Sequence, residues 1–410
     1  MKGLLKSLML CAMLFTAASC VYDFDPQIEG TGGLLVIEGD ILAGDTTIVQ
    51  VSRMSALSDD ATVQSVSGIR VYVESEDGTQ YLADEYYSGQ SNLLDDPHYR
   101  IDTRALDVNQ RCRLVVRLRE SLHWEGLTPV FTYRNYMSDW LEVQQTASVL
   151  DSIGFFVNPE RTQLDVNVWN HGGTEQGYYR WIGREIWEYT SEFRAAVYYN
   201  PSLNKVIPYE NNENYFYCWK RRAPREIMIA STLGLAEDKL SEYTVFSTTN
   251  KGDERFSILY SLTLLQERLT PEAYAYWLAT MRNTSDAGGL MSPQPSDLQG
   301  NIRCEADPDE KVIGFINAST VTRTQKYYRH TVGKFFYSAG NGTVPVILKE
   351  NLWAKYYEMD YRPLWIYIPP DVEEMVNQPE EYEWAPVYTC DCRLRGGYKN
   401  PPANWPYNHF

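Results

Sequence analysis

The residues best placed to do chemistry are the cysteines, of which the sequence has seven. Five of them lie well inside the chain, at Cys112, Cys218, Cys304, Cys390 and Cys392. Cys390 and Cys392 are too close to bond comfortably to one another, and in an extended segment they would point to opposite faces. In an exported chain we therefore expect two disulfides, in which each takes a different upstream partner, Cys218 or Cys304, while Cys112 stays unpaired. A zinc site is the alternative, but known zinc spacings are absent and no histidine lies close to the Cys390–Cys392 pair.

Other candidate groups for chemistry are scattered. The five histidines have no metal-ligand spacing between any two of them; they are His98, His123, His171, His330 and His409. Neither a nucleophile elbow, a phosphate-binding loop nor a dinucleotide fingerprint occurs. Acidic pairs such as Asp95–Asp96 and Glu380–Glu381 could hydrolyse a glycoside only if the fold placed two carboxyls across a sugar. With 54 acidic residues such pairs carry little information. No catalytic residue, metal site or cofactor is predicted.

The first twenty residues have the order of a secretion signal. Lys2 and Lys6 flank the start of an apolar stretch that ends at Phe15, and small residues follow. The stretch is too short to cross a bilayer, which takes ~20 apolar residues. The tetrapeptide Ala17-Ala18-Ser19-Cys20 resembles the lipobox of bacterial lipoproteins. This implies cleavage of residues 1–19 and acylation of the Cys20 thiol and its new amine; an ordinary signal peptide with a chance cysteine is the alternative.

The charge balance limits the possible partners. Without its signal the chain has 35 basic against 54 acidic residues, a balance of −19. This acidity argues against a nucleic-acid partner and against electrostatic adhesion to anionic lipid, so the anchor would hold the protein at the membrane alone. Apart from the signal, no apolar run is long enough for a membrane-spanning helix. Residues 20–33 form a tether in which Asp23 and Asp25 loosely match the export tag of Bacteroidota surface lipoproteins; a solvated linker is the alternative.

From Leu34 onward the pattern predicts a mainly β fold. Short alternating segments such as Thr47–Val51 and Ile69–Glu74, with turns between them, predict an N-terminal immunoglobulin-like β-sandwich over residues 34–145. Residues 146–410 predict a larger β-rich domain that carries a short helical insertion. This helix is expected near residues 271–282, because Thr270 is a suitable N-cap, Pro271 suits the first helical position and apolar residues follow at helical spacing.

Aromatic residues are abundant, with 31 Tyr, 11 Trp and 13 Phe. Such side chains suit sheet packing and binding surfaces alike. The segment from Tyr198 to Tyr217 is rich in Asn and Pro and is expected to be an exposed loop. Its five tyrosines are candidate contacts for a partner or ligand: Tyr198, Tyr199, Tyr209, Tyr215 and Tyr217. The alternative is that they pack on their own sheet.

Taken together, several segments resemble the Bacteroidota lipoprotein family called domain of unknown function 4249. The segments are the lipobox, Leu35–Gly39, Tyr276–Ser319, and the ending that contains Cys390-Asp391-Cys392-Arg393, Gly396-Gly397 and Pro401–Trp405. The match is expected to cover essentially the whole mature chain, and the family's function is undetermined.

Members of this family are often encoded beside TonB-dependent outer-membrane transporters. The resemblance therefore implies a non-catalytic lipoprotein, exposed at the surface of the outer membrane, that helps such a transporter to capture or take up a nutrient. A transporter, together with other surface lipoproteins, is the expected partner. A surface hydrolase acting on glycan or peptide, with its site assembled from distant acids, is the alternative.

The lipid anchor gives the first testable prediction. We expect Cys20→Ala to abolish labelling by a fatty-acid analogue and to release the protein from the membrane fraction, because several acyl chains are needed for stable anchoring. Labelling that is unchanged in this variant would contradict both the anchor and the expected location.

Overall fold

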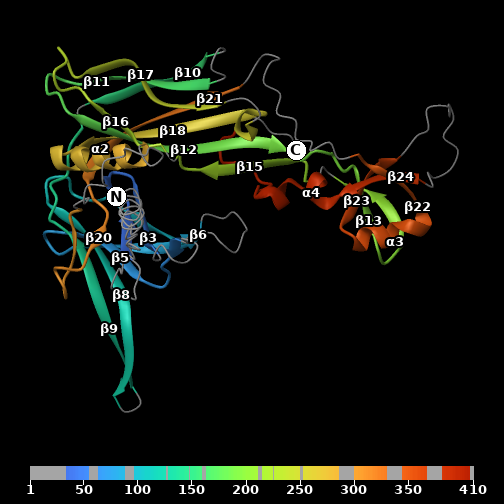
Figure 1. Ribbon diagram of the computed structural model, residues 1–410, viewed down its shortest axis with the longest axis horizontal. Helices are drawn as coiled ribbons and strands as arrows, with labels where there is room; N and C mark the ends of the chain where they lie inside the picture. The colour runs from blue at the N-terminus through green and yellow to red at the C-terminus, as the bar shows by residue number, and fades with distance from the viewer. Residues whose placement is uncertain are drawn as a thin grey trace, which may run out of the picture.

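The computed structural model describes residues 34–406 of the 410, with gaps at 55–62, 88–96, 126–127, 147, 159–162, 211–214, 225, 250–252, 286–299, 330–343 and 367–380. The predicted signal, Cys20 and the tether to residue 33 lie outside the described residues. The fold is mainly β, as the sequence predicts. Figure 1 shows three parts: a first sandwich with a long projecting hairpin, a second sandwich above it, and a smaller distal lobe at the right.

The first sandwich is a ten-stranded sheet that curls around one core. Its order is β19-β9-β8-β5-β6-β7-β3-β1-β20, with β4 beside β3. The strands are β1 (Leu34–Glu38), β3 (Thr46–Met54), β4 (Val63–Ser65), β5 (Arg70–Ser75), β6 (Gln80–Tyr87), β7 (Pro97–Asp102), β8 (Cys112–Glu125), β9 (Thr128–Ser138), β19 (Ile302–Cys304) and β20 (Val312–Ile313). Alternate residues point inward, so that Val71 and Val73 meet Leu114 and Val116 in the core.

Two strands of this sandwich come from far along the chain. β19 pairs with β9, and β20 pairs with β1 in parallel, Leu35 opposite Val312. The side chains of Ile302, Cys304 and Val312 complete the core. Residues 34–145 therefore do not form a complete sandwich by themselves, and the sequence boundary at 145 does not separate two independent units.

The second sandwich packs a six-stranded sheet against a three-stranded one. The larger sheet has the order β15-β12-β18-β21-β2, with β16 beside β12, and the smaller has the order β10-β11-β17. The strands are β2 (Ile41–Ala43), β10 (Val149–Asn158), β11 (Gln163–His171), β12 (Tyr178–Thr190), β15 (Tyr217–Arg222), β16 (Met228–Ser231), β17 (Lys239–Thr249), β18 (Leu259–Leu269) and β21 (Ala318–Tyr328). Tyr179 and Trp181 of β12 share its core with Leu262 and Val166. A 3-10 helix, η1 (Glu254–Phe256), precedes β18.

The predicted helix is confirmed as α2 (Pro271–Ser285), three residues longer than expected at its C-terminal end. The Thr270 hydroxyl accepts a hydrogen bond from the Ala273 backbone N–H at 3.1 Å, as an N-cap does. Trp277 and Met281 lie on the face that packs beside Ile229 and Leu269, at the end of the larger sheet. The apolar stripe therefore packs on the sheet.

The distal lobe is built from two separate segments of the chain. The first gives the hairpin β13 (Val197–Asn200) and β14 (Lys205–Pro208), and the second gives β22 (Val346–Lys349), α3 (Glu350–Glu358), β23 (Tyr361–Ile366), β24 (Glu381–Pro386) and α4 (Val387–Cys390). Its small core is aromatic, with Tyr199 of the hairpin among Trp353, Tyr382 and Trp384. The chain then enters the 3-10 helix η2 (Cys392–Arg395), which leads back to the second sandwich.

A buried ionic cluster joins the two sandwiches. Asp40 lies between β1 and β2, Arg180 on β12 and Glu267 on β18. The Arg180 Nη1 atom contacts the Asp40 carboxylate and lies 3.3 Å from Glu267 Oε1. Asn317 donates its backbone N–H to Asp40 at 3.0 Å and its side-chain amide to Glu267 at 3.2 Å. The Arg180 guanidinium lies 3.7 Å from the Trp277 ring centroid. Complete burial beside Asp40 raises the pKa of Glu267 to about 8.

The raised pKa of Glu267 predicts how stability changes with pH. The unfolded chain releases this proton near the ordinary pKa of 4.5, whereas the folded protein keeps it up to about 8. Between pH 4.5 and about 8 the native state therefore binds more protons than the unfolded chain. The protonated Glu267 side chain adds to the free energy of unfolding; this stabilisation is fully present below pH 4.5 and is lost as the pH rises to about 8. Between pH 4.5 and pH 8 the Glu267→Gln variant should lose less stability than the wild type. Chemical denaturation at these two pH values measures the difference.

The matched control is Glu237→Gln, which removes an exposed carboxyl from the turn before β17. It should follow the wild-type dependence. A Glu267→Gln protein whose stability falls as steeply as that of the wild type would contradict the assignment.

Candidate functional site

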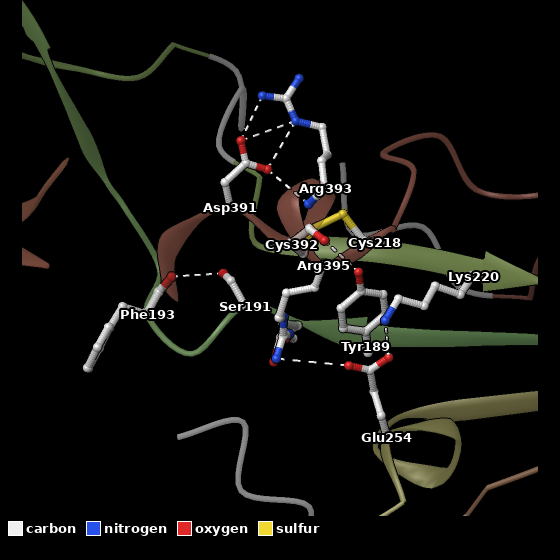
Figure 2. Close-up of a disulfide and its surroundings, with 11 residues drawn as sticks. Tyr189, Ser191, Phe193, Cys218, Lys220, Glu254, Asp391, Cys392, Arg393 and Arg395 are labelled. Carbon is white, nitrogen blue, oxygen red and sulfur yellow. Dashed lines mark hydrogen bonds and ion pairs between the residues drawn. A yellow bond between two sulfur atoms is a disulfide. The ribbon is translucent and has the colours of Figure 1, made fainter. Parts of the chain in front are cut away.

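A disulfide between Cys218 and Cys392 lies where the chain returns from the distal lobe to the second sandwich. The two residues are 174 positions apart in sequence, with Cα atoms 5.8 Å apart. Cys218 belongs to β15, and Cys392 begins η2. Both side chains are fully buried. This confirms one of the two expected disulfides, whose connectivity the sequence left open, and Figure 2 shows that it fastens η2 directly onto the sheet.

The backbone around the disulfide is tightly packed. The Tyr189 hydroxyl donates to the Cys392 carbonyl at 2.5 Å, and the Cys392 N–H donates to the Tyr215 carbonyl at 3.1 Å. Gly397 lies so close to Tyr189 that a Cβ there would collide with the Tyr189 hydroxyl. We define residues 390–405, which contain η2 and continue past Gly397, as the C-terminal strap. Only glycine fits at position 397, since the strap lies directly on β12 and β15.

Charged side chains hold both flanks of the disulfide. The Glu254 carboxylate accepts from Lys220 Nζ at 2.7 Å and lies 3.9 Å from Arg395 Nη1. On the other side Asp391 accepts from the Arg393 backbone N–H at 2.9 Å and from its Nη2 at 2.8 Å (Figure 2). These groups are already engaged with one another in positioning the strap. The arrangement is therefore suited to fixing the distal lobe in place rather than to reacting with a substrate.

The second predicted disulfide is wrong. Cys304 and Cys390 are both free and buried. Cys304 lies in the core of the first sandwich, whereas Cys390 lies in the lobe beside Ala195 and Leu364, so the two belong to different cores. Cys112 is free, as predicted. Burial raises the pKa of the Cys112 thiol to about 12 and that of Cys390 to about 11, so both stay protonated at neutral pH.

The five candidate tyrosines have different environments, and their segment is not a simple loop. Tyr199 is only 5% exposed and packs against Trp353, Tyr357 and Trp384. It is part of the lobe core rather than a contact surface, because the segment folds into the β13–β14 hairpin.

The other four tyrosines are half-buried. The rings of Tyr198 and Tyr209 lie 5.2 Å apart, and burial raises the pKa of Tyr209. Tyr215 lies under Arg393, whose guanidinium carbon is 3.3 Å from the ring centroid. Tyr217 begins β15. These four keep some exposed surface and remain candidate contacts.

Within the described ranges, no group of three or more His, Cys, Asp or Glu side chains is placed to hold a metal ion. Of the acidic pairs, Asp95–Asp96 and Glu380 lie outside those ranges. Among the described residues, no helix has the length and apolar character that a membrane crossing requires.

The sequence reasoning missed the cluster of Asp40, Arg180 and Glu267. One signal was available: β18 reads LYSLTLLQERL, in which Gln266 and Glu267 are polar residues within a largely apolar strand. A carboxyl in such a strand must find a partner, since an unpaired buried charge is costly. Its partners lie 87 and 227 residues upstream, at Arg180 and Asp40, and no local pattern points to them.

The comparison with protein families agrees with the resemblance seen in the sequence. The family described as Domain of unknown function (DUF4249) matches residues 21–325, or 305 of the 410 positions. The chain belongs to this DUF4249 family. The match ends within β21, so it is shorter than the predicted range, and the strap and the second segment of the lobe lie beyond it. No curated protein matches the chain.

Removal of the disulfide should destabilise the protein. Because the bond closes a long loop, Cys218→Ala/Cys392→Ala should lower the free energy of unfolding by about 2–5 kcal/mol. The melting temperature of the wild type should fall in the presence of a reductant, whereas that of the double variant should not respond. Cys304→Ala, which removes a free cysteine, should keep the response to reductant.

Peptide mapping under non-reducing conditions checks the pairing directly. We expect a peptide that links Cys218 to Cys392, with alkylated Cys112, Cys304 and Cys390. Alkylation of Cys218 and Cys392 in the folded protein would contradict the assignment.

Proposed function

We propose that this DUF4249 protein is a lipid-anchored lipoprotein at the outer face of the outer membrane. In this role it is a non-catalytic accessory subunit of a TonB-dependent transporter and helps it to capture or take up a nutrient. The lipobox at Ala17–Cys20 and the secretion signal before it support the anchor. The frequent gene neighbourhood of the family supports the choice of partner.

The observation that carries this proposal is the distal lobe. Its core is formed by buried aromatic residues, yet large apolar side chains project from its outside around α3. Val344 is 80% exposed and Leu203 is 60% exposed, and Ile347 and Met359 are exposed as well. A partner that covered the lobe would remove these exposed apolar side chains from water, which favours binding. We refer to these four residues as the lobe surface.

The attachment of the lobe fits a binding role. The side-chain amide of Asn204, in the β13–β14 turn, lies 3.4 Å from Glu350 at the start of α3, so the two segments of the lobe meet near Leu203. The disulfide and the strap fix the base of the lobe to the second sandwich. A surface held in this way loses little conformational entropy when a partner binds, which favours affinity.

Co-purification from gently solubilised outer membrane tests the proposal. The full-length lipoprotein should co-purify with a TonB-dependent barrel. Leu203→Asp/Ile347→Asp should keep its thermal stability, because both side chains are exposed, but should lose most of the co-purified barrel. The matched control is Leu82→Asp/Leu233→Asp, which adds the same two negative charges at exposed leucines outside the lobe and should leave the barrel bound.

Enzyme assays test the other half of the proposal. The soluble chain from Val21 onward should hydrolyse neither glycans nor peptides. Robust turnover of either would overturn the accessory role in favour of a surface hydrolase. Equal co-purification of the wild type and the lobe variant would contradict the lobe surface as the contact.

A further inference from the structure

Strands β8 and β9 extend well beyond the first sandwich as a two-stranded arm. β5 pairs with β8 only as far as Arg117, and β19 pairs with β9 only from Tyr136 onward, whereas β8 and β9 stay paired to Glu125 and Thr128. The free part of β8, from Leu118 to Glu125, is ~26 Å long at the usual rise of a strand. Figure 1 shows this arm pointing away from the second sandwich and from the lobe.

One face of the arm alternates arginines with aromatic rings. The Arg119 guanidinium lies 4.2 Å from the ring centroid of Phe131, and that of Arg117 lies 5.0 Å from the ring of Tyr133. At the base of the arm Arg113 lies 4.4 Å from the ring of Trp140. Arg113, Arg117 and Arg119 stand at alternating positions of β8, and Phe131 and Tyr133 at alternating positions of β9, so the residues of each strand share one side of the sheet. We call Arg117, Arg119, Phe131 and Tyr133 the arm face.

The arginines of the arm face are not neutralised like their neighbours. Arg113 contacts Glu74 at 2.6 Å, and Arg134, on the opposite side, contacts Glu310 at 2.8 Å and Glu120 at 2.7 Å. Within the described part of the chain, neither Arg117 nor Arg119 has a carboxylate partner; Arg117 instead donates to the Asn135 side-chain oxygen at 3.0 Å.

A third cation strengthens this local positive charge. Arg70 of β5 lies directly opposite Arg117 in the sheet, and like charges in that position repel each other. Two acids of this sheet region are already engaged: Glu74 contacts Arg113, and Glu305 accepts from the Asn135 amide at 2.7 Å. A protein with a net charge of −17 has many acids with which to neutralise these arginines, but here they are unpaired among the described residues. An anionic partner would supply the missing charge.

We propose that the arm face binds the phosphate-bearing headgroups of the membrane surface. Guanidinium groups form paired hydrogen bonds with phosphate oxygens. Aromatic rings are enriched at the boundary between headgroups and acyl chains. The position of the proposed lipid anchor favours the membrane surface as the anionic partner. Residues 20–33 span at most ~50 Å when fully extended, and they lead into β1 of the sandwich that carries the arm. The choice of a membrane partner rests on the proposed anchor at Cys20.

The acidity of the whole chain does not prevent this contact. Charges in water are screened over ~8 Å at physiological ionic strength, so acids elsewhere on the protein have little effect on the arm face. The sequence argument against adhesion to anionic lipid therefore applies to the average surface rather than to this face. The arm would therefore orient an anchored molecule relative to the membrane surface.

Vesicle binding by the chain from Val21 onward tests the proposal, because this chain contains every described residue and lacks the anchor. The probes are vesicles of equal parts phosphatidylglycerol and phosphatidylcholine, and vesicles of phosphatidylcholine alone. The protein should sediment with the first and not with the second, and binding should weaken with added salt. Arg117→Gln/Arg119→Gln should bind roughly 25-fold less tightly, at about fivefold for each arginine.

The matched control is Arg100→Gln/Arg104→Gln, which removes the same charge from an exposed part of the first sandwich. It should bind anionic vesicles like the wild type, and thermal unfolding should show that both variants are folded. Unchanged binding of the arm variant, an equal loss in the control, or equal binding to neutral vesicles would each overturn the proposal.

Complete failure to bind vesicles would overturn the arm contact without affecting the anchor, which fatty-acid labelling of Cys20 tests separately. Loss of the transporter in the arm variant without any vesicle binding would assign the arm to a protein contact instead, and would also overturn the lipid proposal.

Discussion

The buried contact of Arg180 with Asp40 and Glu267 is the constraint on which the arrangement of the two sandwiches depends. Each of the three side chains comes from a different part of the sequence; the carboxyls of Asp40 and Glu267 are buried away from water, and the Arg180 side chain is largely buried. A buried acid without its partner costs several kcal/mol, so the cluster is stable only when both sandwiches are in place. The two sandwiches are therefore expected to fold and unfold cooperatively. Asn317 adds hydrogen bonds to both acids from the strand that enters β21.

The chain crosses between the sandwiches twice at this cluster. The first crossing leads from β1 to β2, and the second leads from β20 to β21, parallel to the first. The backbones approach so closely that two glycines are required. Gly39 and Gly314 both have positive φ angles, and a Cβ on either would collide with a backbone oxygen, that of Ile48 or Ile37. The paired crossings place Asp40 and Asn317 side by side, where Asp40 contacts Arg180 and Asn317 donates to both Asp40 and Glu267.

What could be predicted from the sequence was the local structure. Alternation predicted the strands, and Thr270 with Pro271 predicted the start of α2, because both signals act over a few residues. Long-range pairing was not visible in this way. β19 and β20 contribute only Ile302–Cys304 and Val312–Ile313 to the first sandwich. Strands this short have no clear local pattern, and they form because their side chains pack into the core. Cys304 and Tyr199 were misjudged for the same reason, since their burial depends on segments distant in sequence.

The distal lobe shows how the covalent bond and the fold act together. The chain enters the lobe after Thr190 and returns at β15, then enters it again after β21 and returns at Cys392. The disulfide joins these two points of return, above the hydroxyl of Tyr189. A lobe with so small a core gains little stability from buried apolar area alone. Its two halves are instead held by one fixed point on β12 and β15, so that any partner bound at the lobe is also fixed relative to the second sandwich.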